Sequence, residues 1–389
     1  MMPRLGMVAA LVLVAQVVWL SSSVRTQTQL SALPLDVRAP ADNPTTPEKV
    51  ELGRLLFWDP VLSGTKDVAC ASCHHPDFGY AENLDISIGA HGVGLGTGRR
   101  FDQTGARPFV KRNSQTVLNT AFNGIDTAGV YDPARAPMFW DLRASSLEAQ
   151  ALEPLKALEE MRGDAYPEAA ALDTVVSRLR AIPDYRSRFT KVFGRASAVT
   201  SANLARALAA FQRTLVTTNA PFDRYMRGDA SAMSARAFDG MNRFARIGCA
   251  NCHLGPMFSD YKLHVLGVPD NPKLPASDAG VDNRYQFRTP SLRNLRYTAP
   301  YMHSGTIATL DDVIEFYDDV NGRGGRRGGR TRNPQVARTD LDPLLRRLNV
   351  NGGRRDLVAF LEALSDDSFD KTIPARVPSG LPVGGRIRD

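Results

Sequence analysis

All four cysteines of this 389-residue chain fall in two five-residue segments of the same pattern. Residues 70–74 read Cys-Ala-Ser-Cys-His, and residues 249–253 read Cys-Ala-Asn-Cys-His. The pattern C-x-x-C-H is the attachment signature of c-type haem, in which the two thiols add to the haem vinyl groups and the histidine ligates the iron. A Cys₂His₂ zinc site needs its ligand pairs close together, whereas about 175 residues separate the two segments. The sequence therefore predicts two covalently bound haem c groups, held by Cys70, Cys73, His74, Cys249, Cys252 and His253.

The length and composition set the broad class of the protein. A chain of 389 residues is long enough for two domains, and 43% hydrophobic with 23% charged residues is typical of a soluble globular protein. The formal net charge is +7, which the propionates of two haems would lower. The densest group of arginines, at 323–332, lies in Gly-rich sequence typical of a solvated loop. We find no basic stripe on a recognisable nucleic-acid-binding pattern, so we expect no nucleic-acid partner.

The N-terminal residues have the pattern of an export signal. Arg4 precedes an apolar run over residues 5–20, interrupted by Gln16, and three serines follow at 21–23. This pattern predicts a signal peptide over residues 1–23, and an uncleaved N-terminal membrane anchor is the alternative. Both would export the rest of the chain, and haem c is attached outside the bacterial cytoplasm. We therefore expect the protein in the periplasm.

The chain repeats one plan of helices around its two haem motifs. Apolar residues at helical spacing precede the motifs, over 50–57 and 238–244, and amphipathic helices close both units, over 204–211 and 357–364. Strand patterns are few and short. The sequence thus predicts a mainly α protein with two tandem cytochrome c-like haem domains. The expected organisation is an N-terminal haem domain over 40–228, a C-terminal haem domain over 234–370 and an extended tail over 371–389.

Five short strings beyond the haem motifs carry a family resemblance. They are Gly-Arg-Leu-Leu-Phe at 53–57, Arg-Asn at 112–113, Phe-Trp-Asp at 139–141, Thr-Pro-Ser-Leu-Arg-Asn at 289–294 and Thr-Ala-Pro-Tyr-Met-His-Ser-Gly at 298–305. With these strings, residues 46–366 resemble the bacterial dihaem cytochrome c peroxidase family and, within it, the MauG-type branch. The resemblance implies that the N-terminal domain is peroxidatic and meets hydrogen peroxide, whereas the C-terminal domain transfers electrons.

The resemblance also concerns the second axial ligand of the C-terminal haem. In peroxidases of this family, a methionine about fourteen residues after the histidine of the Pro-Tyr-x-His string binds the iron, and the count from His303 ends at Tyr317. MauG-type enzymes have tyrosine there, and an anionic phenolate favours more oxidised iron than a thioether does. The alternative ligand is Met302, with Tyr317 as an aromatic core residue. Met257 follows the proximal His253 too closely to reach the other face of the haem.

The same resemblance implies a peroxide pocket at the first haem, formed by Gln150, Pro154 and Glu160. Residues 145–148 have the pattern of a capping box that starts a helix, and Gln150 and Pro154 then lie four residues apart on one face. Cleavage of the O–O bond requires a group that moves a proton from the inner to the outer oxygen, and a glutamate suits this role. Without the family pattern, Glu160 would be interpreted as a solvated charge and Gln150 as a helix-surface residue.

Trp140 and His91 have roles implied by the family. Trp140 is expected to relay electrons between the haems because its indole is readily oxidised, and the alternative is a buried aromatic residue. His91 lies in a Gly-rich run after the first motif, where some peroxidases of the family carry a histidine that ligates the resting iron and moves away on reduction. MauG-type enzymes lack this ligand, so His91 as an iron ligand stays an open alternative.

A calcium ion and a protein substrate are further features of the family. Calcium is held between the haem domains by an asparagine side chain, two backbone carbonyls and water, and Asn113, Thr298 and Pro300 match those positions. Oxygen ligands suit this hard cation.

MauG itself has a surface tryptophan two residues before the second haem motif, through which it oxidises its protein substrate. This chain has Ile247 there, which argues against that route.

The function predicted from these features is a periplasmic dihaem c-type peroxidase. It would cleave hydrogen peroxide at the first haem with electrons passed through the second haem from a small redox protein, either a cytochrome c or a cupredoxin. One alternative is MauG-like oxidation of a protein side chain through a peroxide-generated high-valent dihaem state. The other is a non-catalytic electron-transfer cytochrome.

Overall fold

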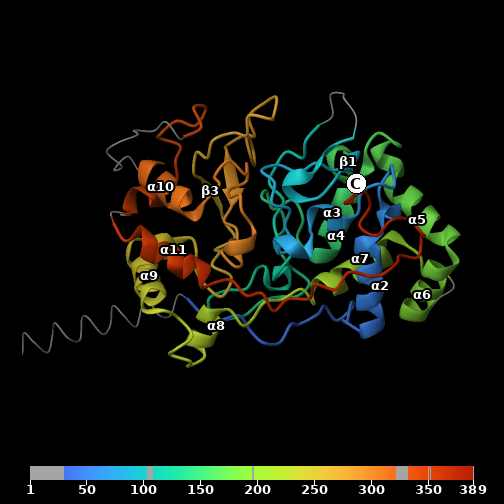
Figure 1. Cartoon of the computed structure of the whole chain (residues 1–389), viewed down its shortest axis with the longest axis horizontal. Coiled ribbons are helices and arrows are strands. Elements are labelled where there is room, and N and C mark those ends of the chain that lie inside the picture. Colours follow the sequence, from blue (N-terminus) through green and yellow to red (C-terminus); the bar gives the residue numbers. More distant parts are fainter. Residues whose placement is uncertain are drawn as a thin grey trace, which may run out of the picture.

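The computed structural model of the chain describes residues 30–102, 108–194, 197–320, 332–348, 350 and 352–388. It is mainly helical, as predicted, and the helices form two lobes that lie side by side (Figure 1). Each lobe has its own large hydrophobic core. The predicted signal peptide and most of the arginine-rich loop lie outside the described residues. Within the described part of the chain, every helix is too short or too polar to cross a membrane.

The first domain is built around a helix pair that flanks the first haem motif. Its helices are α2 (Pro47–Trp58), α3 (Cys70–Cys73), α4 (Leu147–Lys156), α5 (Ala171–Ala181), α6 (Pro183–Phe193) and α7 (Ser201–Gln212). Shorter elements are the 3-10 turns η1 (Pro60–Leu62), η2 (Pro76–Phe78), η3 (Gly96–Gly98), η4 (Thr120–Phe122) and η6 (Glu168–Ala170), the π-helical turn η5 (Leu158–Arg162), and the antiparallel strands β1 (Gly92–Val93) and β2 (Arg100–Phe101). Ser146 caps α4 by accepting a hydrogen bond from the Ala149 amide, so the helix begins one residue later than the capping box at 145–148 predicted.

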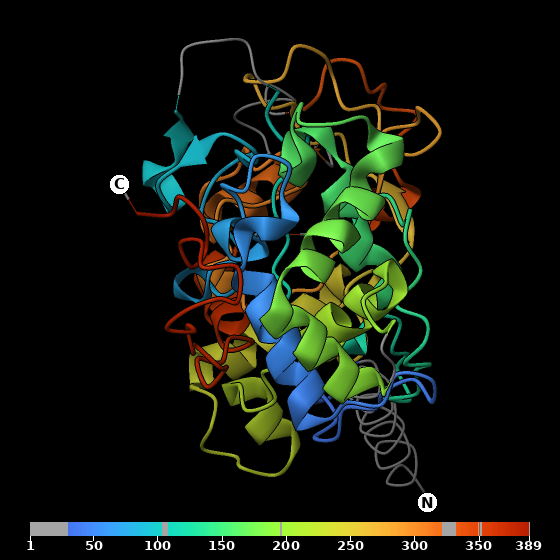
Figure 2. The ribbon, with the colours of Figure 1, turned by 90° about the vertical axis from the view of Figure 1, so that its right-hand side faces the viewer.

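In its described residues, the second domain repeats this plan with fewer helices. They are α8 (Pro221–Met226), α9 (Ala235–Arg246), α10 (Leu310–Val320) and α11 (Arg354–Glu362). The 3-10 turns are η7 (Cys249–Asn251), η8 (Leu295–Tyr297) and η9 (Pro343–Arg347), and strands β3 (Leu263–Val265) and β4 (Gln286–Arg288) pair antiparallel with Leu263 opposite Arg288. In Figure 2, turned by 90°, the first domain lies in front of the second.

One glycine in each domain marks the internal repeat. A Cβ at Gly53 in α2 would lie 2.0 Å from the Ala207 carbonyl oxygen of α7, and a Cβ at Gly240 in α9 would lie 1.9 Å from the Asp356 carbonyl oxygen of α11. Only glycine permits such close crossing of two helix backbones. The helix that precedes each haem motif therefore crosses the helix that closes the unit in the same way, as the repeated pattern predicted.

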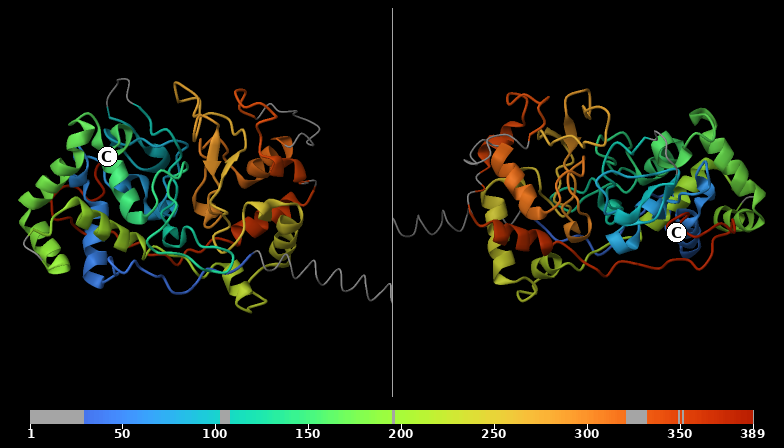
Figure 3. Two further views of the ribbon diagram at one scale, coloured as in Figure 1. Left: turned by 180° about the vertical axis from the view of Figure 1, so that it is seen from behind. Right: turned by 45° about the horizontal axis from the view of Figure 1, so that its top comes forward.

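The two ends of the chain exchange domains. Leu30 packs in the second core, and the Leu33 amide donates to the buried Asp223 carboxylate of α8 at 2.9 Å. In the opposite direction, residues 371–388 return to the first core, where Val377 and Ile387 are buried. Figure 1 shows the blue N-terminal segment and the red C-terminal segment running between the lobes, and both views of Figure 3 agree. Residues 371–388 contain no helix or strand, and they are packed against the first domain.

The structure places α8 differently from our predicted boundary. The Phe222 ring contacts Phe258 and Phe360 in the second core, with ring centroids 5.1 and 5.9 Å away. The Phe222 amide also donates to the Ala363 carbonyl at 3.0 Å. The predicted first domain, 40–228, therefore includes a helix that belongs by packing to the second. A six-residue helix has too little periodicity to show which core it joins.

Candidate functional site

Both C-x-x-C-H motifs open into one continuous cavity between and within the domains. Its lining includes all four cysteines together with His74 and His253. The cysteines form no disulfides, and burial raises the pKa of Cys70 and Cys249 to about 12. Four reduced thiols facing a shared cavity, in two separate domains, fit attachment of two large prosthetic groups better than one small metal site.

The two histidines are held in the same manner. His74 Nδ1 lies 3.1 Å from the Tyr80 carbonyl oxygen, and His253 Nδ1 lies 2.9 Å from the Phe258 carbonyl oxygen. Burial lowers the pKa of His74 to about 4 and also lowers that of His253. Each neutral ring can therefore donate from Nδ1 to a carbonyl and keep the Nε2 lone pair for a metal. This is the usual arrangement of an iron-ligating histidine.

The residues predicted for the peroxide pocket come together at the first motif. Gln150 and Pro154 on α4 and Glu160 on η5 all line the cavity with Cys70 and His74. Burial raises the pKa of the Glu160 carboxyl to about 7, although Arg143 opposes the rise. A carboxyl with this pKa can both accept and release a proton near neutral pH. The solvated-surface interpretation of Glu160 does not fit this position.

The backbone that carries Glu160 is held from two sides. The Ala90 amide donates to the Glu160 carbonyl oxygen at 2.8 Å, and the Gly64 amide donates to the Met161 carbonyl oxygen at 2.7 Å. A Cβ at Gly89 would lie 2.2 Å from the same Glu160 oxygen. Backbone contacts this close leave no space for a side chain at Gly89, so they fix the position of the π-helical turn.

The structure does not bring His91 to the cavity. Its Nε2 lies 3.4 Å from the Asp164 carboxylate, and His91 is absent from the described residues that line the cavity. The loop around it is fixed by the buried Arg99, which donates to the carbonyl oxygens of Ile88, Gly89 and Gly94 at 2.6 to 3.0 Å. His91 therefore occupies a non-ligating position, the arrangement expected of the MauG-type alternative.

Trp140 lies where the two domains meet. Its Nε1 donates to the Asn113 carbonyl oxygen of the first domain at 3.0 Å, and its own carbonyl oxygen accepts from the Arg288 amide of β4 at 2.7 Å. The indole lines the cavity and meets the His303 ring edge-on, with ring centroids 6.3 Å apart. A residue bonded to both domains is well placed to couple them.

Tyr317 and Met302 both line the cavity on the side of the second motif. Tyr317 lies in α10, and burial raises the pKa of its phenol well above its ordinary value. The phenol therefore stays neutral unless a cation compensates for the buried charge of the phenolate, and ferric iron would be such a cation.

The three residues predicted to hold calcium also line the cavity. Asn113 donates from its side-chain nitrogen to the carbonyl oxygens of Leu84 and Asp85, at 2.8 and 3.2 Å. These bonds fix the amide and leave Oδ1 as its remaining acceptor. Thr298 and Pro300 reach the same cavity from the second domain. Oxygen atoms from both domains are therefore available for a hard cation.

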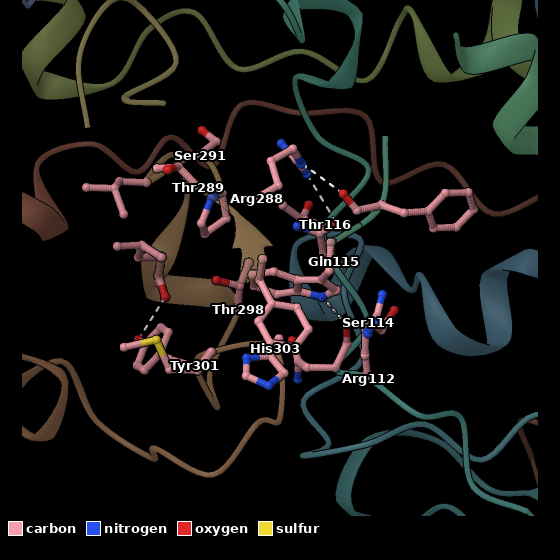
Figure 4. A pocket seen from close by; sticks show the side chains of 18 of the residues that line it. Arg112, Ser114, Gln115, Thr116, Arg288, Thr289, Ser291, Thr298, Tyr301 and His303 are labelled. Carbon is pink, nitrogen blue, oxygen red and sulfur yellow. Dashed lines mark hydrogen bonds between the residues drawn. The ribbon is translucent and has the colours of Figure 1, made fainter. Parts of the chain in front are cut away.

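Arg288 is a site residue that sequence reasoning missed. Its side chain donates to the Phe139 carbonyl oxygen at 2.8 Å and to Gln115 at 3.2 Å, and Figure 4 shows it directed across the cavity towards Gln115. It is 5% exposed, burial lowers its pKa to about 10, and no carboxylate of the described residues pairs with it. Buried charges are normally paired. A buried cation in a cavity therefore indicates an anionic ligand, and haem carries two carboxylates.

His264 also lies in the cavity near the second motif. Its two ring nitrogens lie 3.0 Å from Asp260 and 2.6 Å from Asp342. The carboxylate of Asp260, with that of Asp342, raises the pKa of His264 to about 11. The contact with Asp342 joins β3 to the residue that caps η9.

Tandem helical domains with two C-x-x-C-H motifs on one cavity define the class of two-haem cytochromes. The sequence profile described as di-haem cytochrome c peroxidase matches residues 47–231. The methylamine utilization protein MauG of Methylorubrum extorquens is 37% identical over 346 residues, covering 88% of this chain and 85% of that protein. The cytochrome-c peroxidase IdrP1 of Denitromonas iodatirespirans is also 37% identical, covering 85% of this chain and 84% of that protein.

Two further comparisons agree with these. The cytochrome c551 peroxidase of Nitrosomonas europaea is 31% identical over 87% of this chain and 86% of its own length. A solved structure of a MauG-like protein associated with microbial copper homeostasis superposes with a TM-score of 0.68 at 28% identity, over 86% of this chain and 95% of that one. This chain belongs to the di-haem cytochrome c peroxidase family. It is a peroxide-using oxidoreductase with two haem groups.

Proposed function

We propose that this protein is a periplasmic peroxidase that reduces hydrogen peroxide in its first domain with electrons accepted through its second domain. The observation that carries the proposal is Glu160, an acid with a pKa near 7 in the cavity shared with Cys70 and His74. The relatives named as cytochrome c peroxidases support the reaction. The N-terminal export pattern supports the periplasm.

The cavity fits two covalently attached haems. Thioether bonds would form at the four cysteines, His74 and His253 would ligate the irons through Nε2, and Arg288 would balance haem propionates. When bound, the haems supply redox-active iron to which peroxide can coordinate. Asn113, Thr298 and Pro300 would hold a calcium ion that joins the domains.

The side chains of the first domain supply the proton chemistry. The Glu160 carboxylate takes the proton from the inner oxygen of peroxide and returns it to the leaving outer oxygen, which departs as water. The Gln150 amide donates a hydrogen bond that orients peroxide. Pro154 adds bulk to the pocket without a side-chain donor or ligand and so would leave iron held by His74 accessible to peroxide. Trp140, bonded to both domains, provides the route for electrons between them.

A peroxide titration of the ferric holoprotein tests the proposal. One equivalent of hydrogen peroxide is expected to change the haem absorption spectrum within the mixing time. Reduced cytochrome c should then be oxidised in the ratio of two per peroxide. An unchanged spectrum would identify a non-catalytic electron-transfer cytochrome instead.

The close contact at Gly89 leads to a matched pair of variants. Gly89→Ala should displace the Glu160 backbone and slow peroxide cleavage by about 10²-fold, because a misplacement of about 1 Å has effects of this size. Gly98→Ala is the control, since a Cβ at Gly98 meets nothing within 4 Å. Stopped-flow spectroscopy measures both rates. Equal rates in the two variants would show that the contact does not position Glu160.

We also propose that Tyr317 would ligate the iron of the C-terminal haem. Tyr317→Phe removes the oxygen donor and should convert that haem from six-coordinate low spin to five-coordinate high spin, as measured by electron paramagnetic resonance and absorption. Met302→Leu should leave the spectrum nearly unchanged. The reverse result would identify Met302 as the ligand and the protein as a methionine-ligated peroxidase.

Oxidation of a protein side chain is the second candidate function. Tyr317 in the second-haem cavity and the similarity to MauG favour it. Ile247 argues against oxidation of a protein substrate through a surface tryptophan at this position. An isoleucine side chain does not carry oxidising equivalents as an indole does, and this one is only 8% exposed. Peroxide consumption in the absence of any electron donor, with loss of tryptophan or tyrosine from an added protein, would distinguish this function from peroxide reduction.

A further inference from the structure

Exposed arginines surround the start of the second haem motif. Arg246 ends α9, and Arg346 and Arg347 end η9. These elements are in contact, because a Cβ at Gly248 would lie 3.3 Å from Leu348 and 3.9 Å from the Arg347 carbonyl oxygen. The three exposed cations therefore lie around the segment that leads into Cys249.

The basic surface continues onto the start of α11. The Arg243 side chain packs against Gly353, where a Cβ would lie 2.3 Å from its Nε, and Gly353 precedes the exposed Arg355. Two acidic residues of this region form ion pairs with other arginines: Asp356 pairs with Arg236 at 3.9 Å and Glu315 with Arg354 at 3.3 Å. Among the described residues, no carboxylate forms an ion pair with Arg246, Arg347 or Arg355.

The part of the cavity at the second haem motif lies directly beneath these arginines. Leu344, Leu345 and Leu348 of the η9 segment line the cavity together with Cys249. The arginines of η9 are thus on the outer side of a wall whose inner side faces the haem site. At the first motif the chain covers itself instead, because Ser72 of α3 donates to the Gly384 carbonyl oxygen of the C-terminal tail at 2.8 Å.

We propose that the basic surface formed by Arg246, Arg346, Arg347 and Arg355 is the docking site for the electron donor, a small c-type cytochrome whose haem edge is surrounded by carboxylates. The inference rests on the proposed peroxidase function and adds the charge and location of the partner. Relatives named as cytochrome c peroxidases favour a cytochrome. Opposite charges on the two partners speed their encounter and orient them. Each of two ferrocytochromes gives one electron, and with two protons one hydrogen peroxide becomes two waters.

A charge-reversal pair tests the surface in the holoprotein. Arg346→Glu/Arg347→Glu reverses two charges on η9, and Arg186→Glu/Lys191→Glu makes the same change on exposed residues of α6 in the first domain. An acidic bacterial cytochrome c is the probe. We expect the η9 variant to raise both the Kd, measured by calorimetry at low ionic strength, and the KM by about 10-fold or more, with kcat unchanged. Salt at 0.5 M should remove the difference, because it screens exposed charges.

Two other electron donors distinguish a loss of docking from a loss of peroxidase activity. Basic mitochondrial cytochrome c should bind the η9 variant at least as well as the unmodified protein, and hydroquinone, a small neutral donor, should support equal turnover in all three proteins. Equal Kd values for the acidic cytochrome in the η9 variant and the unmodified protein would overturn the docking site, as would equal losses in the α6 variant. If no donor, hydroquinone included, supports peroxide reduction by the unmodified protein, the peroxidase function itself fails.

Discussion

Glu160→Gln is expected to slow peroxide cleavage by about 10²–10⁴-fold, the usual effect of losing a positioned acid–base group. Glutamine keeps the size of the side chain but cannot accept the proton from peroxide. Both haems should remain attached, because Glu160 contributes no ligand. The rate is measured by stopped-flow absorption after mixing the ferric holoprotein with peroxide. Glu159→Gln is the matched control, since this neighbour does not belong to the described cavity lining.

The pH dependence of the rate follows from the raised pKa of Glu160. The carboxyl has a pKa of about 7 because it is buried. It is therefore protonated and inactive as a base below pH 6, and ionised above pH 8. The rate of peroxide cleavage should rise through pH 7 in the unmodified protein and lose this inflection in Glu160→Gln. If the variant retained both the rate and the inflection, the acid–base group would lie elsewhere.

Cys249→Ser with Cys252→Ser is expected to reduce the haem content from two to one. Serine cannot form the thioether bonds, and the part of the cavity at the second motif would then hold haem only through His253. Peroxide reduction by an external cytochrome should fall to background, because electrons enter through the second domain in our proposal. A pyridine haemochrome assay and the intact mass measure the haem content, and Cys70→Ser with Cys73→Ser provides the converse variant. A single haem in the unmodified protein would contradict the duplicated plan.

The helix–haem–helix repeat could be predicted because its signals are local. The haem motifs are contiguous, and the helices at Gly53 and Gly240 show periodic apolar residues next to them. The location of α8 could not be predicted, because Phe222 finds its partners Phe258 and Phe360 far along the chain. The packing of the tail was missed for the same reason, since Val377 and Ile387 pack in the first core and the Gly384 amide bonds to Trp58, partners that lie far from the tail in the sequence.

The candidate site was predictable mainly through the family resemblance. A glutamate in a polar segment has no periodic signal, so only the family pattern indicated Glu160. Arg288 was missed because what distinguishes it is the lack of a carboxylate partner within the described part of the chain, which is visible only in three dimensions. The position of His91 outside the cavity could not be predicted for a similar reason. Contacts of its ring with Asp164 and of its loop with Arg99 hold it there.

The exchange of chain ends has a consequence for biogenesis. The Gly384 amide donates to the Trp58 carbonyl oxygen at 2.8 Å, so the last residues of the chain complete the domain that its first helices begin. In the export that we propose, the chain would emerge from its N-terminus and present Cys70 and Cys73 long before Gly384. During that interval the first motif would lack this covering and be accessible to the haem-attachment enzymes. The order of translocation would thus give haem attachment a time window that closes when Gly384 arrives.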